Sequence, residues 1–353
     1  MVTHVHGSEN NAVEPAAPSL LKLTKFAPPA RANAPSVETR APTVDERAKE
    51  ERARDESSKD ESYKLHRRFD RLGRLFGDGA VKDLMDARVV VFGVGGVGSF
   101  AAEALARSAI GHLMLVDFDD VCVTNANRQI QAMQGTIGKP KAEVLRDRLR
   151  LVNPKATIES HRIFYNAERS DELLRAPWPG SHEGYDFVVD CIDNITAKTH
   201  LIASCVKAGI PIVTSMGAAG KLDPTRVRIA DLADTEMCRL ARDVRKILRK
   251  KHGFPAKGKM GVQAVYSDEE RTWPRALTYD GGEGFKCVCP HKSDEHGCDS
   301  RQLIDGTAVY VTGTFGLVAS SVVVNTLTER YRGMAPPLAS LRGTVAADER
   351  DDD

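Results

Sequence analysis

The chain has few aromatic residues, no long apolar run and almost no net charge. Of its 353 residues 6% are aromatic, and 50 lysines and arginines face 49 aspartates and glutamates. A net charge of +1 excludes a generally basic protein, so any nucleic-acid-binding surface has to be local. No stretch approaches the roughly 18 consecutive apolar residues of a membrane helix, and the N-terminus lacks an apolar signal core. We therefore expect a cytoplasmic protein without a membrane span.

Cysteine is also scarce, and no Cys-x-x-Cys pair occurs. Seven cysteines, an odd number in a chain of ordinary size, argue against a disulfide framework. Hydrophobic residues make up 41% of the chain, which is enough to bury a sizeable core. These features indicate a soluble globular protein whose thiols are reduced.

Both ends of the chain have the composition of disordered segments. The first 60 residues are rich in Ala, Pro, Glu, Arg and Ser and show no sustained apolar period, although alternating charges favour a solvated helix over 44–61. Residues 335–353 combine Pro, Gly and Ala with an acidic end. We predict a disordered tail over 1–60 and a loose tail over 335–353, which leaves 61–334 as the folded domain.

Short β-branched runs alternate with longer helical patterns between the two tails. This alternation predicts an α/β fold with right-handed crossovers and a doubly wound, mainly parallel, Rossmann-like sheet. Ligands of such sheets bind at the carboxyl ends of the strands. The predicted strands are 89–92, 112–116, 156–159, 187–190 and 210–213, and the predicted helices are 97–108, 139–151, 196–208, 236–252 and 307–329.

A glycine-rich loop follows the first predicted strand. Its glycines are Gly93, Gly95, Gly96 and Gly98, and an Ala-rich helical pattern comes directly after them. Glycine permits a tight turn and lets backbone amides approach an anion at a helix N-terminus. Asp117 ends the next strand, at the spacing expected of an acid that binds a ribose. These two features alone favour a dinucleotide-binding oxidoreductase.

The residues after Asp117 favour ATP cleavage instead. Arg128 and Lys141 follow this strand, and Asp193 follows the predicted strand 187–190. Cleavage between the α and β phosphates of ATP has to neutralise pyrophosphate, for which arginine and lysine are suited, whereas hydride transfer needs no such cations. A carboxylate such as that of Asp193 is a typical Mg²⁺ ligand. The predicted cofactors are therefore ATP and Mg²⁺.

These motifs together resemble the ubiquitin-activating-like adenylyltransferases, which include the molybdopterin-synthase and thiamine-biosynthesis activators. The resemblance extends from about Arg68 to Arg330. It implies that the four glycines form the phosphate turn, that Asp117 binds ribose, and that Asp193 holds the metal. It further implies that Arg71 reaches into the site of a neighbouring subunit, and hence a homodimer. The remaining residues of the implied nucleotide site are Asp119, Asn125, Asn127, Arg128, Lys141 and Asn194.

Each of these residues also has a purely structural interpretation. The glycine loop alone is compatible with a structural turn, and Arg71 with a surface charge on an N-terminal helix. Asp193 is compatible with a capping role for the helix that follows it. The occurrence of all the motifs together favours the functional interpretation.

A strongly basic predicted helix over 236–252 distinguishes this chain from relatives that activate carrier proteins and commonly hold zinc with two Cys-x-x-Cys pairs. It looks like the branch of tRNA threonylcarbamoyladenosine dehydratases, which cyclise a modified adenosine beside the anticodon. Locally clustered cations attract a phosphate backbone even when the total charge is near zero. Ile247 and Leu248 give the helix a thin apolar stripe, so we expect it on the surface. The predicted tRNA-binding residues are Arg239, Arg242, Arg245, Lys246, Arg249, Lys250 and Lys251.

A cysteine-bearing loop is predicted over 281–306. Cys298 lies near the position where the dehydratase branch carries a cysteine implicated in catalysis, but Cys287, Cys289 and Cys238 are alternatives. A thiolate acts as nucleophile or proton acceptor where cations lower its pKa. A zinc site formed by Cys287, Cys289, His291, His296 and Cys298 is the minority interpretation. Three further cysteines are expected to be packing residues: Cys122, Cys191 and Cys205.

Three other functions stay open from the sequence. The first is an adenylyltransferase that activates the C-terminal glycine of a ubiquitin-like sulfur carrier, with sulfur-transfer proteins as candidate partners. The second is a noncatalytic nucleotide-sensing scaffold, and the third is a nicotinamide-dependent oxidoreductase. The complete set of phosphate-handling residues argues against the last two.

Overall fold

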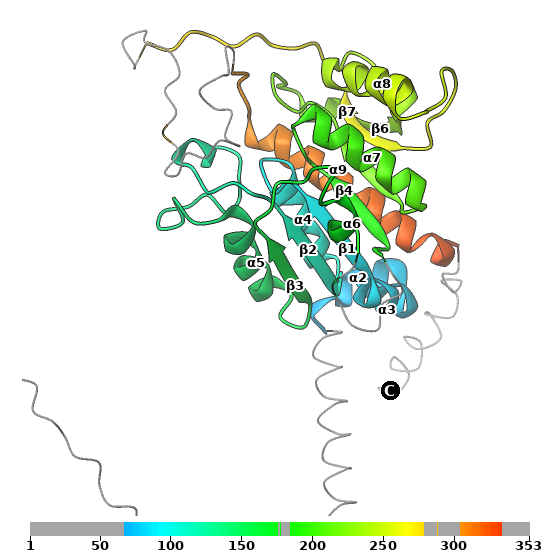
Figure 1. The fold of residues 1–353 in the computed structure, drawn as a ribbon. Coiled ribbons are helices and arrows are strands. Elements are labelled where there is room, and N and C mark those ends of the chain that lie inside the picture. Colours follow the sequence, from blue (N-terminus) through cyan, green and yellow to red (C-terminus); the bar gives the residue numbers. More distant parts are fainter. Residues whose placement is uncertain (1–66, 176, 178–183, 279–287, 289–303, 334–353) are drawn as a thin grey trace, which may run out of the picture. The chain divides into compact units, whose positions relative to one another are not determined.

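A seven-stranded sheet forms the centre of the protein, which we analysed as a computed structural model (Figure 1). The structure describes residues 67–175, 177, 184–278, 288 and 304–333, all of which belong to one compact unit that spans 57–353. The predicted tails 1–60 and 335–353, and most of the predicted cysteine-bearing loop, lie outside the described residues.

The strand order is β3-β2-β1-β4-β5-β7-β6, and every neighbouring pair is parallel except β6 with β7. The predicted α/β fold with a doubly wound, mainly parallel sheet is thus confirmed. The order reverses at β1, so the loops after β1 and β4 meet at the topological switch point, where such sheets bind ligands. The strands are β1 Arg88–Phe92, β2 His112–Val116, β3 Thr157–His161, β4 Phe187–Asp190, β5 Ile212–Ser215, β6 Val227–Asp231 and β7 Gln263–Ser267.

Helices cover both faces of the sheet. Residues of α3, α4, α5 and α9 belong to the core cluster on one face, and residues of α6, α7 and α8 to the cluster on the other. The α-helices are α2 Asp70–Phe76, α3 Asp78–Asp86, α4 Gly98–Arg107, α5 Lys141–Val152, α6 Ser170–Leu173, α7 Ile195–Ala208, α8 Arg239–Lys251 and α9 Val309–Leu327. The described 3-10 helices are Val123–Asn125, Pro224–Arg226, Leu232–Asp234 and Glu329–Tyr331.

The central strand β1 shows how the sequence divides between these two cores. Val89 and Val91 pack into the cluster with α4 and α9, whereas Val90 and Phe92 pack into the cluster with α7 and α8. All four side chains are fully buried, as expected of a parallel strand with helices on both faces. This sandwiching fixes the end of β1, and hence the glycine loop that follows it.

Helix α9 is the most apolar helix among the described residues. Among the described helices, only α9 has the length and the mean hydropathy, 1.4, of a candidate membrane span. Of its apolar 18-residue window, 56% is buried inside the protein. Gly313 and Gly316 allow it to pack closely on α4, where added Cβ atoms would meet the side chain of Phe100 and the backbone of Val97. The apolar composition of α9 is therefore explained by its place in the core.

Candidate functional site

The glycine loop forms a close-packed turn at the carboxyl end of β1. Gly93 has φ +81°, a conformation that favours glycine. A Cβ on Gly98, the first residue of α4, would lie 1.8 Å from the carbonyl oxygen of Gly93. A Cβ on Gly93 would in turn lie 2.8 Å from the carbonyl oxygen of Cys191 after β4. These two glycines are required by the turn itself.

Gly95 and Gly96 have a different environment. The nearest described atom to a Cβ on Gly95 would be Nε2 of Gln129, at 3.8 Å, and a Cβ on Gly96 would lie 3.2 Å from the Arg128 side chain. Within the described part of the chain, their amides donate to no carbonyl. Amides at the head of the ten-residue helix α4 suit an anion such as a phosphate.

Asp117, which follows β2, holds the glycine loop in place through hydrogen bonds. Its Oδ2 accepts a hydrogen bond from the Val94 amide at 2.7 Å, and its Oδ1 accepts one from the Asp119 amide at 2.9 Å. The residue is only 8% exposed, and burial raises the pKa of its carboxyl above the ordinary value. Asp117 therefore positions the loop, and contact with a ribose stays a prediction.

Lys141 opens α5 and lies against two of the predicted acids. Its Nζ is 2.7 Å from Oδ2 of Asp119, and its side chain is 7% exposed. Burial alone would lower the pKa of Lys141, but the carboxylates of Asp117 and Asp119, with a contribution from Asp193, raise it above the ordinary value. The structure thus brings Lys141 together with Asp117 and Asp119, and Asp193 acts on the lysine only electrostatically.

The segment between β2 and α5 brings further predicted residues to the loop. Arg128 donates to the carbonyl oxygen of Thr124 at 2.9 Å and to Oδ1 of Asn127 at 3.0 Å, and its aliphatic stem lies beside Gly96. Asn125 accepts a hydrogen bond from the Cys122 amide through Oδ1, at 2.9 Å, so it has a structural role in the turn. All three predicted residues lie at the carboxyl edge of the sheet.

Gln129 is a residue near the loop to which the sequence analysis assigned no role. It is 6% exposed, and its Oε1 has no hydrogen-bond partner within the described residues. A buried polar atom beside a ligand loop is usually satisfied by a ligand or water. Its position directly after Arg128 was the only signal in the sequence.

A buried ion pair supports the second ligand loop, after β4. Nζ of Lys198 on α7 lies 2.6 Å from Oδ2 of Asp190, and both side chains are fully buried. Oδ1 of Asp190 accepts from the Ile192 amide at 3.0 Å, which shapes the turn that leads to the exposed Asp193. Asn194 caps α7 by accepting from the Ala197 amide at 3.0 Å. Sequence reasoning missed Lys198, because lysine is rarely fully buried.

Arg71 lies apart from these residues within one chain. It is exposed on α2, and the nearby Arg68 donates to the carbonyl oxygen of Val152, where α5 ends and the chain returns to the amino edge of the sheet. The glycine loop lies at the opposite, carboxyl edge. Arg71 is therefore not brought to the phosphate loop of its own chain, and its predicted contribution would have to come from a second subunit.

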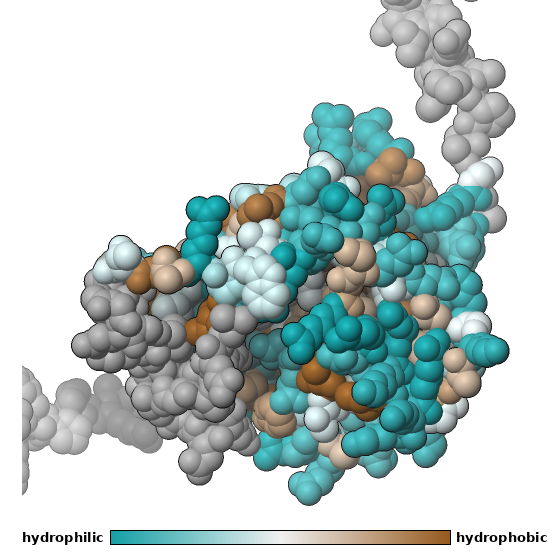
Figure 2. Space-filling view, turned by 90° about the horizontal axis from the view of Figure 1, so that it is seen from above, coloured by the Kyte–Doolittle hydropathy of each residue, from teal (hydrophilic) through white to brown (hydrophobic). Residues whose placement is uncertain are grey.

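Helix α8 divides its basic residues between two roles. Its buried side consists of Ala241, Val244 and Leu248, of which only Leu248 belongs to the expected stripe of Ile247 and Leu248. Arg245 is half-buried and donates to the Thr235 carbonyl oxygen at 2.9 Å, and Arg249 donates to that of Pro255 at 3.2 Å. The exposed cations are Arg239, Arg242, Lys246, Lys250 and Lys251. Figure 2, seen from above, shows a mainly hydrophilic surface with small separate apolar patches.

The described cysteines are buried or half-buried free thiols. Burial raises the pKa of both Cys191 and Cys205 to about 12, and Cys238 is 7% exposed at the start of α8. Among the described residues no group of three or more metal-ligating side chains occurs. The predicted catalytic Cys298 and the candidate zinc ligands Cys287, Cys289, His291 and His296 lie outside the described residues.

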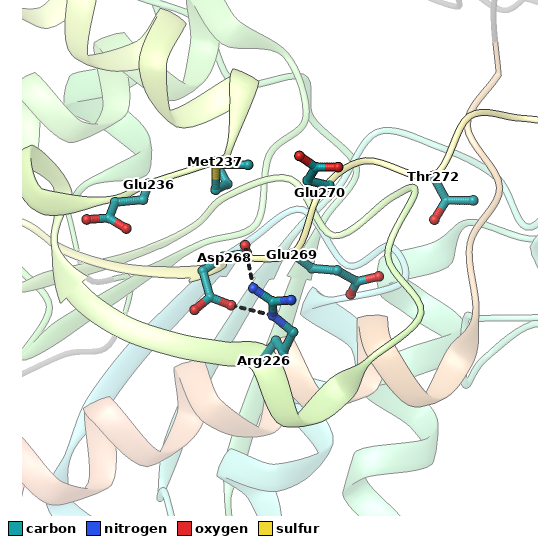
Figure 3. Close-up of a pocket in the computed structure, with 7 residues that line it drawn as sticks. All are labelled: Arg226, Glu236, Met237, Asp268, Glu269, Glu270 and Thr272. Carbon is teal, nitrogen blue, oxygen red and sulfur yellow. Dashed lines mark hydrogen bonds and ion pairs between the residues drawn. The ribbon is translucent and has the colours of Figure 1, made fainter.

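A pocket of about 660 Å³ opens beside the end of β7 (Figure 3). Glu236 and Met237 line one side of it, at the start of α8, and Glu270 and Thr272 line another. Asp268 is paired with Arg226 at 2.8 Å. The acidic lining of the pocket disfavours phosphate groups, so we do not expect the triphosphate of a nucleotide to bind there.

The fold and this site define a Rossmann-like α/β protein with a glycine-rich loop at the switch point of the sheet and a buried lysine paired with Asp119. The ThiF family model matches residues 69–346, and the chain belongs to this family. It is 38% identical over 270 residues to the tRNA threonylcarbamoyladenosine dehydratase of Haemophilus influenzae, covering 74% of this chain and 94% of that protein. Identity to the enzyme of that name from Escherichia coli (strain K12) is 40%, over 72% of this chain and 91% of the relative.

The fold agrees with a solved structure of such a relative. The crystal structure of the E. coli tRNA N6-threonylcarbamoyladenosine dehydratase in complex with ATP matches with a TM-score of 0.62 at 37% sequence identity. The match covers 75% of this chain and 95% of that one. The resemblance expected from the sequence motifs is therefore confirmed.

Proposed function

We propose that the chain is an ATP-dependent enzyme that dehydrates threonylcarbamoyladenosine in tRNA beside the anticodon. The observation that carries this proposal is the similarity to dehydratases along more than nine-tenths of their length, in a chain that keeps the phosphate-handling residues together. A tRNA substrate also accounts for the exposed cations of α8. A cytoplasmic location follows from that substrate.

The proposed chemistry begins with adenylation of the substrate carboxylate. A carboxylate oxygen attacks the α-phosphorus of ATP, and the bond to pyrophosphate breaks. Ring closure on the activated carbonyl then expels AMP, so that water is removed in net terms. Negative charge builds up on the leaving pyrophosphate, and stabilising it requires fixed cations near the loop.

The residues of the site have distinct parts in this scheme. The backbone amides of Gly95 and Gly96 would donate hydrogen bonds to phosphate oxygens. Arg128 and Lys141 would offset the negative charge that develops on the leaving pyrophosphate. Asp193, exposed at the carboxyl edge and close enough to affect the pKa of Lys141, would hold Mg²⁺ together with the phosphates. Mg²⁺ would screen the charge between the phosphates when bound.

A homodimer is part of the proposal. Arg71 is exposed and lies at the opposite edge of the sheet from its own glycine loop, so only a partner subunit could bring it to the phosphates. An arginine from a neighbouring subunit would add a planar, doubly donating cation to the site.

The test is incubation of the purified chain with ATP, Mg²⁺ and tRNA that carries threonylcarbamoyladenosine, followed by mass spectrometry of the nucleosides. The proposal predicts a nucleoside lighter by one water, together with AMP and pyrophosphate. Folded, ATP-binding protein that leaves the nucleoside unchanged would contradict it. In that case, pyrophosphate exchange that depends on a ubiquitin-like sulfur carrier would support the alternative adenylyltransferase.

The catalytic thiol is tested in the same assay. Cys298→Ala should abolish cyclisation while Cys287→Ala and Cys289→Ala retain it, with ATP binding as the control in all three. Full activity of Cys298→Ala would refute this assignment.

A further inference from the structure

The segment after β7 carries an exposed aromatic residue that the proposed chemistry does not use. Trp273 lies in the run Arg271-Thr-Trp-Pro-Arg275, and it is 67% exposed. A tryptophan that remains in water forgoes a large apolar gain, and its broad ring is well suited to contact a ligand.

Two features hold the ring in place. The guanidinium carbon of Arg271 lies 4.5 Å from the centroid of the Trp273 ring, a cation–π contact. Nε of Arg271 is itself 3.0 Å from Oδ1 of Asp305, so the cation is anchored. Pro274 restricts the backbone of the preceding tryptophan to extended conformations. One face of the ring is thus backed by a fixed arginine while most of the side chain stays open to solvent.

A chain of hydrogen bonds joins this segment to the nucleotide site. The Thr272 amide donates to the Gly220 carbonyl oxygen at 2.8 Å, and the Gly220 amide donates to that of Gly306 at 2.8 Å. The next residue, Thr307, accepts through its carbonyl oxygen from Nδ2 of Asn127 at 3.0 Å. Trp273 therefore belongs to the same carboxyl edge of the sheet as the phosphate loop.

Charges of both signs lie near the ring: Arg271 contacts it, and the exposed Glu236 and Glu270 line the adjoining pocket. Arg275, two residues further on, is exposed and forms no ion pair with any described residue. Two neighbouring acids are already engaged: Asp268 is paired with Arg226 and Arg228, and Glu269 accepts from the amides of Leu222 and Asp223.

Glu236 and Met237, which precede α8, lie across the pocket from Glu270 and Thr272 of this segment (Figure 3). Isolated aromatic rings interleaved with cations bind single-stranded nucleic acid, because bases stack on the rings and phosphates meet the cations. A protein partner would instead need a continuous apolar centre, whereas Trp273 lies between Arg271 and Arg275 in the chain.

We propose that Trp273 is a stacking platform for an unpaired base of the RNA substrate, with Arg275 at the neighbouring phosphate. This inference rests on the proposed function, since it assumes that the nucleic acid is the tRNA whose modified adenosine enters the nucleotide site. Every base has an aromatic face, so the platform holds the loop without selecting a sequence.

Intrinsic fluorescence offers a direct test, because the chain has two tryptophans, Trp178 and Trp273. In a Trp178→Phe background all tryptophan emission comes from Trp273. Titration with an anticodon stem-loop that contains threonylcarbamoyladenosine should quench this emission to saturation. A stem-loop that binds, as measured by anisotropy, without changing the emission would overturn the proposal.

Kinetics provide the second test. Trp273→Leu should raise the KM for tRNA about 5- to 150-fold, the range for loss of one base–aromatic stack, while the KM for ATP stays unchanged. Trp273→Phe should restore most of the loss. Leu277→Ala is the matched control, since Leu277 is 59% exposed in the same segment, and it should behave as the unaltered chain.

The outcomes separate this inference from the proposed function. An unaltered chain that fails to convert the nucleoside contradicts the proposed function. Conversion with an unchanged KM for tRNA in a folded Trp273→Leu variant contradicts the stacking platform alone. Thermal unfolding of the variant establishes that it is folded.

Discussion

Alanine at Gly98 should impair both folding and ATP binding, whereas alanine at Gly95 of the same loop should impair ATP binding alone. A methyl on Gly98 would lie 1.8 Å from the Gly93 carbonyl oxygen, so the turn would have to open by at least about 1.6 Å to reach ordinary contact. Gly93 has no room to yield, because its own Cβ direction faces the Cys191 carbonyl oxygen at 2.8 Å. Gly98→Ala should therefore destabilise the fold by about 3 kcal/mol and also abolish ATP binding.

Gly95→Ala is the matched partner of this change. The nearest described atom to its methyl would lie at 3.8 Å, so the free energy of unfolding should change by less than about 0.5 kcal/mol. If the Gly95 amide meets a phosphate, however, the methyl intrudes on the ligand. ATP affinity should then fall at least about tenfold, which corresponds to about 1.4 kcal/mol.

Denaturant unfolding and calorimetric titration with ATP measure the two effects separately. Gly98→Ala with unchanged stability would show that the turn is less tightly packed than the structure indicates. Gly95→Ala with unchanged ATP affinity would refute the assignment of this loop to the phosphates, whatever the result for Gly98→Ala.

Three further changes probe other parts of the site. Lys141→Met leaves buried acids unpaired and should cost about 3–5 kcal/mol of stability. Because the folded-state pKa of Lys141 is raised, the stability difference measured by urea unfolding should be complete below the ordinary lysine pKa of 10.5. It should disappear as the pH rises through the folded-state pKa of Lys141. A stability difference confined to acid pH would contradict the pairing with Asp119. Cys191, whose pKa burial raises to about 12, should resist iodoacetamide in the native protein at mildly alkaline pH, and rapid labelling seen by peptide mass spectrometry would disprove its burial. Arg71→Ala and Lys141→Met should each abolish cyclisation. If Arg71 acts across the dimer, mixed dimers of the two variants should regain part of the cyclisation activity. Verified mixed dimers that regain no activity would argue that Arg71 acts within its own chain.

The sequence predicted the strands that carry the site, because their apolar runs are long and end in recognisable polar residues. Asp117 and Asp190 both fall at strand ends, and the parallel arrangement then brings their loops to one edge. Strands β6 and β7 were missed. β6 has no fully buried residue, so its pattern lacks the apolar signal, and β7 is a five-residue run with only two strand-forming residues, Val265 and Tyr266.

The environment of individual charged residues was not predictable from residue type. Lys198 is fully buried against Asp190, although lysine in a helix normally indicates a solvent-facing position. On α8, Arg245 turns toward Thr235 whereas Arg242 and Lys246 face solvent. The apolar residues Ala241, Val244 and Leu248, at spacings of three and four, determine which side is buried. Of the two residues expected to form the apolar stripe, Leu248 belongs to the buried side, whereas the adjacent Ile247 is only half-buried.

The central claim is that ATP activates the carboxylate of a modified tRNA nucleoside at the glycine loop of this chain. Oxygen-18 placed in the carboxylate of threonylcarbamoyladenosine in tRNA follows that step directly. After a single turnover with unlabelled ATP, mass spectrometry should find the label in the phosphoryl group of AMP and none in pyrophosphate. Cyclised nucleoside accompanied by unlabelled AMP, or by ADP, would contradict adenylation of the carboxylate.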